Sequence, residues 1–199
     1  LASIKWLIFQ GDVEKSTKTI DAFIALLRST ISNMDEYITI EMEIENLKNY
    51  VLINNTRYGD KVRVECFVTF GCEECKIPKM ILQPFVENAF FHAFPYEAKG
   101  NIKILVRMLW GKLQIQIVDN GVGIPDENLQ KLTGEHAKTE HFSGIGINNV
   151  SDRLKLLYGS EYGIKFESKE NHGTTVTIQI PVANNRNVWL VTNNDCNHV

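Results

Sequence analysis

The sequence predicts an α+β fold in which a two-layer α/β sandwich follows a helical N-terminal segment. In the first 58 or so residues, hydrophobic side chains recur at three- and four-residue steps, which is typical of amphipathic helices. After Gly59 and Asp60 they alternate, which is typical of half-buried strands. A chain of 199 residues is long enough for one well-packed domain and a smaller helical element. We therefore divide it into residues 1–58, 59–182 and 183–199.

The helical segment carries two apolar stripes. Asp12 follows a break at Gly11 and is suited to N-cap the first long helix. The first stripe consists of Ile20, Phe23, Ile24, Leu27 and Ile31, and the second of Ile40, Ile44, Leu47, Val51 and Ile53. Neither helix can bury its stripe alone, so we expect packing on the preceding helix end (residues 4–8), on each other, or on a second copy. Dimerisation through a helical bundle is the most economical of these arrangements.

Five segments of alternating hydrophobicity predict five strands. They are residues 62–68, 102–108, 113–117, 164–166 and 176–180. Gly111 marks a tight hairpin between the second and the third. A sheet with one apolar face needs a cover, and the segments near residues 79–94 and 145–158 are predicted to supply helices. The asparagine-rich tail after residue 182 favours no particular structure.

The composition disfavours some classes of function. With a net charge of −3 and 23% charged residues, the chain resembles soluble globular proteins and lacks the strongly basic balance of a nucleic-acid binder. No run approaches 18 consecutive apolar residues, and residues 1–6 show neither an initiator methionine nor a signal peptide. We therefore expect a fragment of a longer protein, with any membrane span or sensor in the missing part.

The cysteines do not form a recognisable metal site. Cys72 and Cys75 make a C-x-x-C motif with Cys66 nearby, and Cys196 lies alone in the tail. A structural zinc site normally needs four ligands, and no second C-x-x-C or histidine pair supplies the others. Reduced thiols on a loop are the favoured interpretation.

Residues 82–92 carry the first chemically suggestive motif. A spacing of four places Asn88 and His92 on one face of a helix, about 5–6 Å apart. An amide oxygen is a suitable ligand for Mg²⁺, which keeps several waters and takes further ligands from phosphates. His92 could donate to a phosphate or lie beside a ribose. An isolated pair of this kind is more often part of a protein core, so the interpretation depends on the motifs that follow.

A glycine turn follows the third predicted strand. Asp119 ends that strand and leads into Gly121 and Gly123. A carboxylate in this position can accept from the exocyclic amine of adenine, and the glycines allow backbone to approach the base closely. On its own this pattern is also that of an ordinary turn.

A second glycine turn opens the last predicted helix. Gly144, Ile145 and Gly146 begin it, and free N–H groups together with the helix dipole favour phosphate there. The polar stretch before it, residues 125–143, is typical of a mobile lid, and its two histidines are expected to be solvated. Each motif is weak alone, but their order and separation together predict an ATP site.

With these motifs the chain resembles the catalytic half of sensor histidine kinases of the LytS/YesM type, in the GHKL ATPase superfamily. That type has a leucine-glutamine-proline run leading into glutamate-asparagine-alanine and a histidine, as residues 82–92 do. Its D-x-G-x-G and G-I-G-x-x-N-V motifs match residues 119–123 and 144–150. The resemblance extends from Leu1 to about Pro181. It implies the Bergerat ATP-binding fold behind a truncated dimerisation and phosphotransfer segment.

The resemblance also implies a function. It predicts a catalytic region that binds Mg-ATP and transfers the γ-phosphate to a histidine of the helical domain, from which it passes to an aspartate of a response-regulator receiver domain. The implied partners are that receiver domain and a second protomer, both contacted by the helices around residues 12–32. The implied location is the cytoplasmic part of an inner or plasma membrane protein.

The resemblance assigns roles to individual residues. The implied catalytic residues are Asn88, Glu87 and His92, with Asn88 as the magnesium ligand. The residues implied to bind nucleotide are Asn88, His92, Asp119, Gly121, Gly123, Gly144, Ile145, Gly146 and Thr174. In this assignment Asp119 reads adenine directly, Thr174 reaches it through water, and the second glycine turn shapes the phosphate end.

Three departures from the family pattern matter. Relatives usually carry a basic residue where this chain has Phe91, and a glycine where it has Ala93. We therefore expect weaker nucleotide affinity. The first histidine is His92, already assigned to the ATP site, so we expect the acceptor histidine just before Leu1. On this interpretation the fragment alone does not autophosphorylate.

Three alternatives remain. ATPases of the gyrase, MutL or Hsp90 kind place a hydrolytic glutamate one turn before the magnesium asparagine, where this chain has Pro84. Glu87 points about 100° away from Asn88 on a helix, which disfavours it as a hydrolytic base. A nucleotide-binding pseudokinase scaffold gains some support from Phe91. The last alternative is a sandwich whose glycine turns are purely structural.

Overall fold

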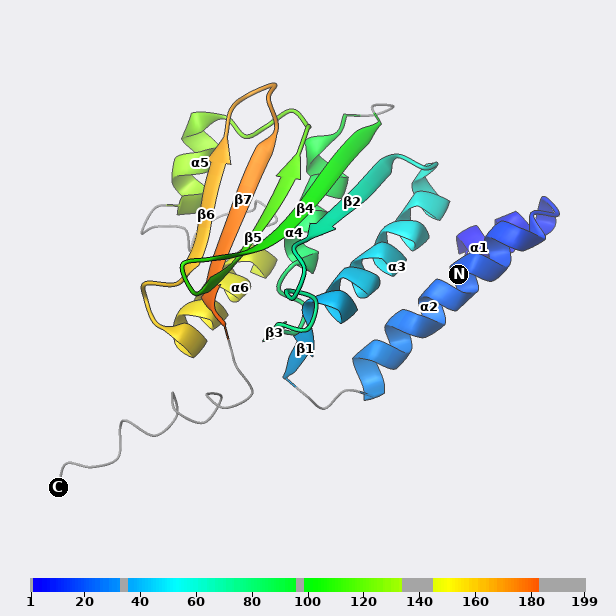
Figure 1. Ribbon diagram of the computed structural model, residues 1–199. Coiled ribbons are helices and arrows are strands. Elements are labelled where there is room, and N and C mark those ends of the chain that lie inside the picture. The colour runs from blue at the N-terminus through cyan, green and yellow to red at the C-terminus, as the bar shows by residue number, and fades with distance from the viewer. Residues whose placement is uncertain (1, 33–35, 96–98, 134–144, 183–199) are drawn as a thin grey trace.

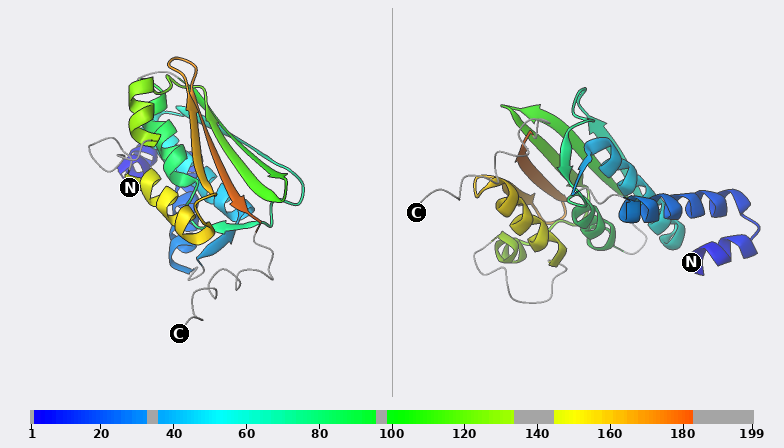
Figure 2. Two further views of the ribbon diagram at one scale, coloured as in Figure 1. Left: turned by 90° about the vertical axis from the view of Figure 1, so that its left-hand side faces the viewer. Right: turned by 90° about the horizontal axis from the view of Figure 1, so that it is seen from below.

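The predicted two-layer sandwich is confirmed. The computed structural model describes residues 2–32, 36–95, 99–133 and 145–182. A five-stranded sheet forms one layer, and helices cover one of its faces (Figure 1). Figure 2 shows α4, α5 and α6 on the same side of the sheet, while α1 and α2 project beyond it.

All five predicted strands form one mixed sheet. In chain order they are β2 (Val62–Val68), β4 (Gly100–Leu109), β5 (Lys112–Asp119), β6 (Gly163–Ser168) and β7 (Thr174–Pro181). Their order in the sheet is β2-β4-β5-β7-β6, with β2 parallel to β4 and every other pair antiparallel. The β4–β5 hairpin turns at Trp110 and Gly111, whose φ values of 52° and 75° suit a two-residue turn.

The two faces of the sheet differ in polarity. Ile102, Ile104 and Val106 of β4 are buried beneath the helices. On the opposite face Arg107 Nε donates to Gln114 Oε1 at 2.7 Å, and Gln116 Nε2 donates to the Thr177 hydroxyl at 3.3 Å. The alternation that predicted the strands therefore separates an apolar face from a face of hydrogen-bonded polar side chains.

The predicted helical cover is also confirmed. It consists of α4 (Gln83–Asn88), a π-helical turn η1 (Ala89–Ala93) and α6 (Ile145–Tyr158). Phe90 and Leu154 are fully buried against the sheet. A further helix, α5 (Asp126–Thr133), lies in the segment that was expected to be a polar lid.

Three helices precede the sheet: α1 (Ala2–Phe9), α2 (Val13–Ser32) and α3 (Ile40–Tyr58). Asp12 is the N-cap of α2, as predicted, because its Oδ1 accepts from Lys15 N at 3.0 Å. Thr39 caps α3 in the same way through Met42 N, and Gly59 ends it with a φ of 83°. Within the described ranges, no helix is both long and apolar enough to cross a bilayer.

The stripe on α3 belongs to the core of the sandwich. Ile40, Ile44, Leu47 and Val51 are buried in the same cluster as the sheet residues. Asn55 then clamps the α3–β2 turn, accepting from Val62 N at 3.0 Å and donating to Val62 O. Although α3 lies within residues 1–58, it therefore packs as part of the helical layer.

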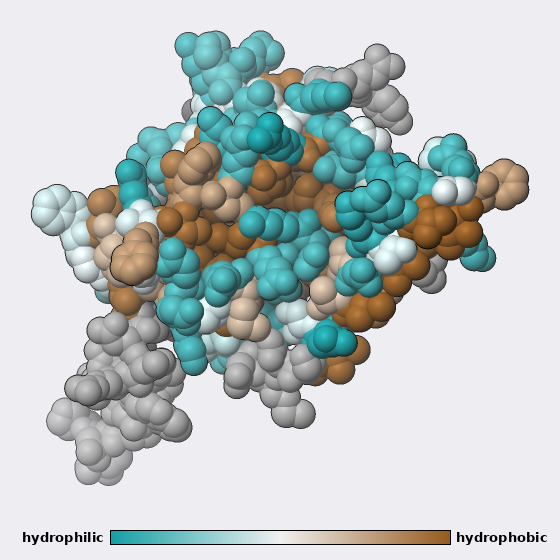
Figure 3. Space-filling model, turned by 45° about the vertical axis from the view of Figure 1, so that its right-hand side comes forward, coloured by the Kyte–Doolittle hydropathy of each residue, from teal (hydrophilic) through white to brown (hydrophobic). Residues whose placement is uncertain are grey.

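The stripe on α2 has a different environment. Its face toward α3 is formed by small residues, Ser16, Thr19 and Ala22, which are buried, and the Thr19 hydroxyl bonds that of Thr56 at 3.0 Å. The predicted stripe from Ile20 to Ile31 is exposed instead. Hydrophobic residues accordingly gather along the edge of the molecule formed by α1 and α2 (Figure 3).

A small second sheet was not predicted. It pairs β1 (Tyr37–Thr39) with β3 (Lys76–Pro78), antiparallel, with Ile38 opposite Ile77. Each strand has only three residues, too few for a period to be recognised, and the pairing is long-range. It connects the start of α3 to the segment that leads into α4.

The packing of α3 predicts a stability difference between two identical substitutions. Leu47→Ala, at a side chain that is 1% exposed, is expected to lower the free energy of unfolding by about 2–5 kcal/mol through lost burial and a cavity. Leu156→Ala on α6, at 85% exposure, is the control and should change it by less than about 0.5 kcal/mol. Urea unfolding measures both. Equal effects would mean that α3 is not part of the cooperative core.

Candidate functional site

A cavity of about 570 Å³ lies between the start of α6 and the outward side of α4 and η1. Its lining residues are Pro84, Glu87, Asn88, Phe91, His92 and Gly146. The structure thus brings together residues from the first and third sequence motifs. The volume lies within the range of small-molecule sites.

The helix that carries the first motif changes type at Asn88. The α-helix ends there and a π-helical turn follows to Ala93. A π-helix has i to i+5 hydrogen bonds, so a step of four residues is slightly less than one full turn. Asn88 and His92 therefore lie on the same side of the helix, and both line the cavity. Ala89 and Phe90 are buried and anchor this turn to the sheet. An amide and an imidazole are therefore presented together from a fixed backbone.

Glu87 reaches the cavity although it is adjacent to Asn88 in sequence. The carboxylate also lies beside Tyr50 of α3. Burial, followed by the effect of this carboxylate, raises the pKa of Tyr50 to about 12. Glu87 therefore stands between α3 and the cavity.

Asp119 lies at the end of β5, opposite Thr174 in the strand register. Its Oδ1 accepts from Gly121 N at 2.9 Å and from Thr174 N at 3.3 Å. The residue is 9% exposed, and burial raises the pKa of its carboxyl above the ordinary aspartate value, against the effect of these two bonds. Both bonds fall on Oδ1, so neither occupies Oδ2.

The turn after Asp119 is held against the end of η1. Val122 N donates to Ala93 O at 2.8 Å, and a Cβ on Gly121 would lie 2.3 Å from the same oxygen. Gly123, with a φ of 69°, has no room for a Cβ because Lys169 O would lie 2.1 Å away. The expectation that the glycines make room for a base is therefore incomplete, since protein backbone already requires both. The turn after Asp119 is thus hydrogen-bonded to the end of η1, the helical turn that carries His92.

Ser168 was not predicted from the sequence, and its hydroxyl lies beside that of the predicted Thr174. Ser168 Oγ accepts from Ile124 N at 2.8 Å, donates to Gly173 O at 2.9 Å, and lies 2.9 Å from the Thr174 hydroxyl. These bonds fix the side chain of Thr174. Ser168 stands opposite Thr174 in the β6–β7 register, which no local pattern in the sequence reveals.

Phe91 forms part of the cavity wall and of an aromatic cluster. Its ring packs edge-on against Tyr58 and Phe90, with centroids 5.7 and 5.3 Å apart. The side chain is 41% exposed. This part of the wall is therefore apolar, without the cation that the family pattern leads one to expect.

The predicted second glycine turn lies at the start of α6. Gly144 lies outside the described residues, and Ile145 is the first residue of α6. A Cβ on Gly146 would lie 3.3 Å from Pro84 Cβ, so this glycine lets α6 approach α4 closely.

Cys66, Cys72 and Cys75 are free thiols, and the described part of the chain holds no group of three or more metal-ligating side chains.

Two family matches divide the chain. Residues 76–184 match the family of histidine kinase-, DNA gyrase B- and HSP90-like ATPases, and residues 1–62 match the histidine kinase family. Among curated relatives, sensor histidine kinase YesM of Bacillus subtilis is 29% identical over 92% of this chain, and sensor protein LytS of Staphylococcus haemolyticus is 30% identical over 85% of it. The matched regions amount to 31% and 29% of those proteins.

Solved structures share the fold. The histidine kinase domain of the Erythrobacter litoralis EL346 blue-light activated histidine kinase superposes with a TM-score of 0.54 at 16% identity, covering 94% of this chain and 86% of that one. Acinetobacter baumannii histidine kinase AdeS gives 0.52 at 18% identity, with coverages of 90% and 84%. At these identities the likeness concerns the fold alone.

The environment of Asp119 predicts an unusual dependence of stability on pH. Its carboxyl has a raised pKa in the folded state, so its contribution to stability is full below the unfolded pKa and is lost as pH rises through the folded pKa. Asp119→Asn keeps the oxygen that accepts from Gly121 and Thr174. Because an amide does not ionise, the variant does not lose stability as pH rises through the pKa of the Asp119 carboxyl. Urea unfolding from pH 4 to 8 should show the variant at least as stable as wild type at pH 7, with the two converging at the acid end. A variant less stable by more than about 1 kcal/mol at pH 7 would contradict this account.

Proposed function

The chain belongs to the family of histidine kinase-, DNA gyrase B- and HSP90-like ATPases, and we propose that it is the catalytic region of a two-component sensor histidine kinase. The observation that carries this proposal is the cavity in which Asn88, His92 and Gly146 meet. The match of residues 1–62 to the histidine kinase family and the similarity to YesM and LytS support a kinase in particular. The chain spans about a third of the length of those relatives.

The side chains around the cavity fit Mg-ATP chemically. The amide oxygen of Asn88, beside the Glu87 carboxylate, suits Mg²⁺, which binds oxygen ligands and retains waters. His92 would donate to a phosphate oxygen. At the adenine end of the proposed site, Oδ2 of Asp119, which takes no part in the bonds to Gly121 and Thr174, would accept from the exocyclic amine of adenine, with Thr174 beside it. Gly144, Ile145 and Gly146 would bring backbone N–H groups to the phosphates.

The wall of the cavity favours a kinase over a hydrolase. Pro84 stands one helical turn before Asn88 and carries no group that could activate water. Glu87 lies beside the Tyr50 hydroxyl, in a position to orient ligands of the metal. Bound Mg-ATP would supply a transferable phosphoryl group, and the residues of this chain would bind it, orient it and stabilise its charge.

The exposed stripe on α2 supports a proposal about partners. Ile20, Phe23, Ile24 and Leu27 form an apolar face that α1 and α3 leave uncovered, and α1 adds Trp6 and Phe9 at its end of the molecule. An apolar stripe on a helix is normally buried in a bundle. We propose that a second protomer covers it, and that a response-regulator receiver domain docks on the same helical region.

Nucleotide binding tests the site. Asn88→Ala is expected to weaken Mg-ATP binding by at least about tenfold in calorimetric titration, because it removes the metal ligand, while the unfolding curve stays unchanged. Asn49→Ala on α3, outside the cavity lining, is the matched control. Acid-labile phosphate on a histidine in the chain extended upstream would support the kinase. Binding without transfer would favour the scaffold that Phe91 suggests, and unaltered binding in Asn88→Ala would exclude the site.

The dimer proposal has its own test. Ile24→Asp places a charge in the middle of the α2 stripe, where burial in a dimer would be costly. Sedimentation equilibrium should show the dissociation constant of the dimer raised by at least about 100-fold, which favours the monomer, with nucleotide binding unchanged. Asp21→Asn, on the same helix but outside the stripe, is the control. If Ile24→Asp associates as wild type does, the stripe is not the dimer interface.

A further inference from the structure

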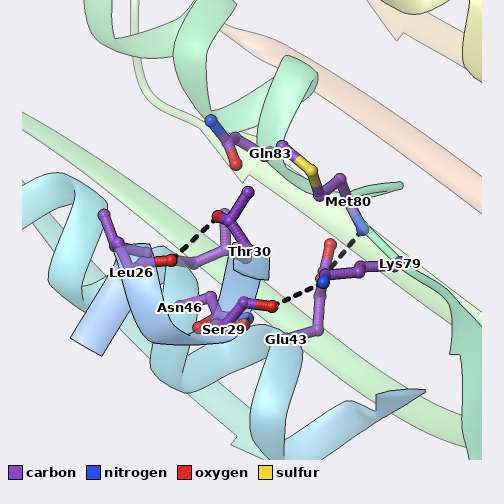
Figure 4. A pocket seen from close by; sticks show the side chains of 9 residues that line it. Leu26, Ser29, Thr30, Glu43, Asn46, Lys79, Met80 and Gln83 are labelled. Atoms are coloured by element: carbon purple, nitrogen blue, oxygen red, sulfur yellow. Dashed lines mark hydrogen bonds between the residues drawn. The ribbon is translucent and has the colours of Figure 1, made fainter. Parts of the chain in front are cut away.

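The segment Lys79–Leu82 leads directly into α4, and a buried carboxylate holds it. Glu43 of α3 accepts from Met80 N through Oε2 at 3.1 Å and from Leu82 N through Oε1 at 3.0 Å. Figure 4 shows Glu43 directed toward Met80 from the neighbouring helix. The side chain is 2% exposed. Both oxygens of one carboxylate thus bind the backbone ahead of α4.

Other elements bind the same short segment. Arg153 of α6 donates to Lys79 O at 2.7 Å, and Lys79 N donates to Glu36 O at 3.0 Å. Lys79 Nζ donates to Ser29 O in the last turns of α2 (Figure 4). A cavity of about 20 Å³ between α2, α3 and this segment has room for about one water molecule. The two helices that border the nucleotide cavity, α4 and α6, are therefore tied to each other and to α2 at one place.

A carboxylate is an unusual residue at a position as buried as that of Glu43. Leu82 is the N-cap residue of α4 and makes no side-chain capping bond. A buried ionised group is costly unless hydrogen bonds satisfy it, and apolar residues would fill the same space at no such cost. The pKa of Glu43 is raised above its ordinary value by burial, against the opposite effect of the three backbone N–H groups of residues 80–82 and of the charge of Arg153. Two directed bonds to one backbone segment give orientation, which apolar packing alone does not.

We propose that Glu43 is a positioning residue for the nucleotide site: it fixes the backbone ahead of α4 and so sets where Glu87 and Asn88 stand in the cavity, and Lys79 makes that position depend on α2. The proposal deepens the proposed function and rests on it for the identity of the ligand. Since linkage is reciprocal, a nucleotide that binds when Glu43 and Lys79 make these hydrogen bonds also stabilises the contact between Lys79 and Ser29 of α2.

Glu43→Gln tests the proposal, with Glu45→Gln as the matched control. Glu45 lies on the same helix and is exposed. The glutamine keeps the volume of Glu43 but replaces one acceptor by a donor that faces an N–H group. We expect the Kd for Mg-ATP to rise about tenfold in Glu43→Gln and to stay unchanged in Glu45→Gln, both measured well below the melting temperature. A merely structural role would lower the melting temperature and leave the Kd of the folded protein unaltered.

Hydrogen exchange of the nucleotide-free protein separates this proposal from the proposed function. Exchange of residues 83–92 should be faster in Glu43→Gln than in wild type, while that of β4 and β5 stays the same. If wild type fails to bind Mg-ATP, the proposed function fails and this comparison alone decides the positioning role. The positioning role is overturned if exchange of residues 83–92 is the same in Glu43→Gln as in wild type. It is also overturned if wild type binds Mg-ATP and Glu43→Gln binds it with the same Kd.

Lys79→Met keeps the test open if Glu43→Gln does not fold. It retains the apolar stem and removes only the bond to Ser29 O. A rise in Kd of about threefold is expected, with faster exchange of residues 83–92 and of the last turns of α2. If neither the Kd nor the exchange changes, the link between α2 and α4 is refuted.

Discussion

The apolar face of the sheet is buried under α3, α4 and α6, and the geometry of the candidate site depends on that contact. Phe90 and Leu154 lie fully buried on the sheet. Once those side chains point inward, the opposite sides of the same helices carry Asn88 and Gly146 outward to a common cavity. The polar groups of the site are therefore held by hydrophobic burial, which is non-directional, and need a second means of orientation.

Hydrogen bonds to backbone provide this orientation. Asp119 binds the turn that follows it and the strand beside it through one oxygen, and Ser168 fixes Thr174 behind it. Glu43 of α3 binds the backbone ahead of α4 through both oxygens. Asp119 and Glu43 are buried, and the partners of both are backbone N–H groups. Burial thus holds the layers together, and these bonds align them.

Much of this could be predicted because the signals were local. The five strands follow from alternation, and the glycine turns and the asparagine helix from residue types at short spacing. Other features could not, because they depend on partners far away in the chain. β1 and β3 pair across nearly 40 residues, Ser168 meets Thr174 only through sheet register, and the change of helix type at Asn88 has no local marker.

Periodicity and short motifs are local properties of the chain, and they predict the two-layer architecture and the family. Of the site residues predicted in this way, four line the candidate cavity: Glu87, Asn88, His92 and Gly146. Ile145 begins α6, and the others within the described residues lie outside that lining: Asp119, Gly121, Gly123 and Thr174. What each amphipathic face contacts depends on the tertiary structure. The stripes of α2 and α3 look alike in sequence, yet Leu47 is buried in the sandwich while Leu27 is exposed. Periodicity states that a helix has an apolar face, and the long-range packing of the sheet determines which of those faces it covers.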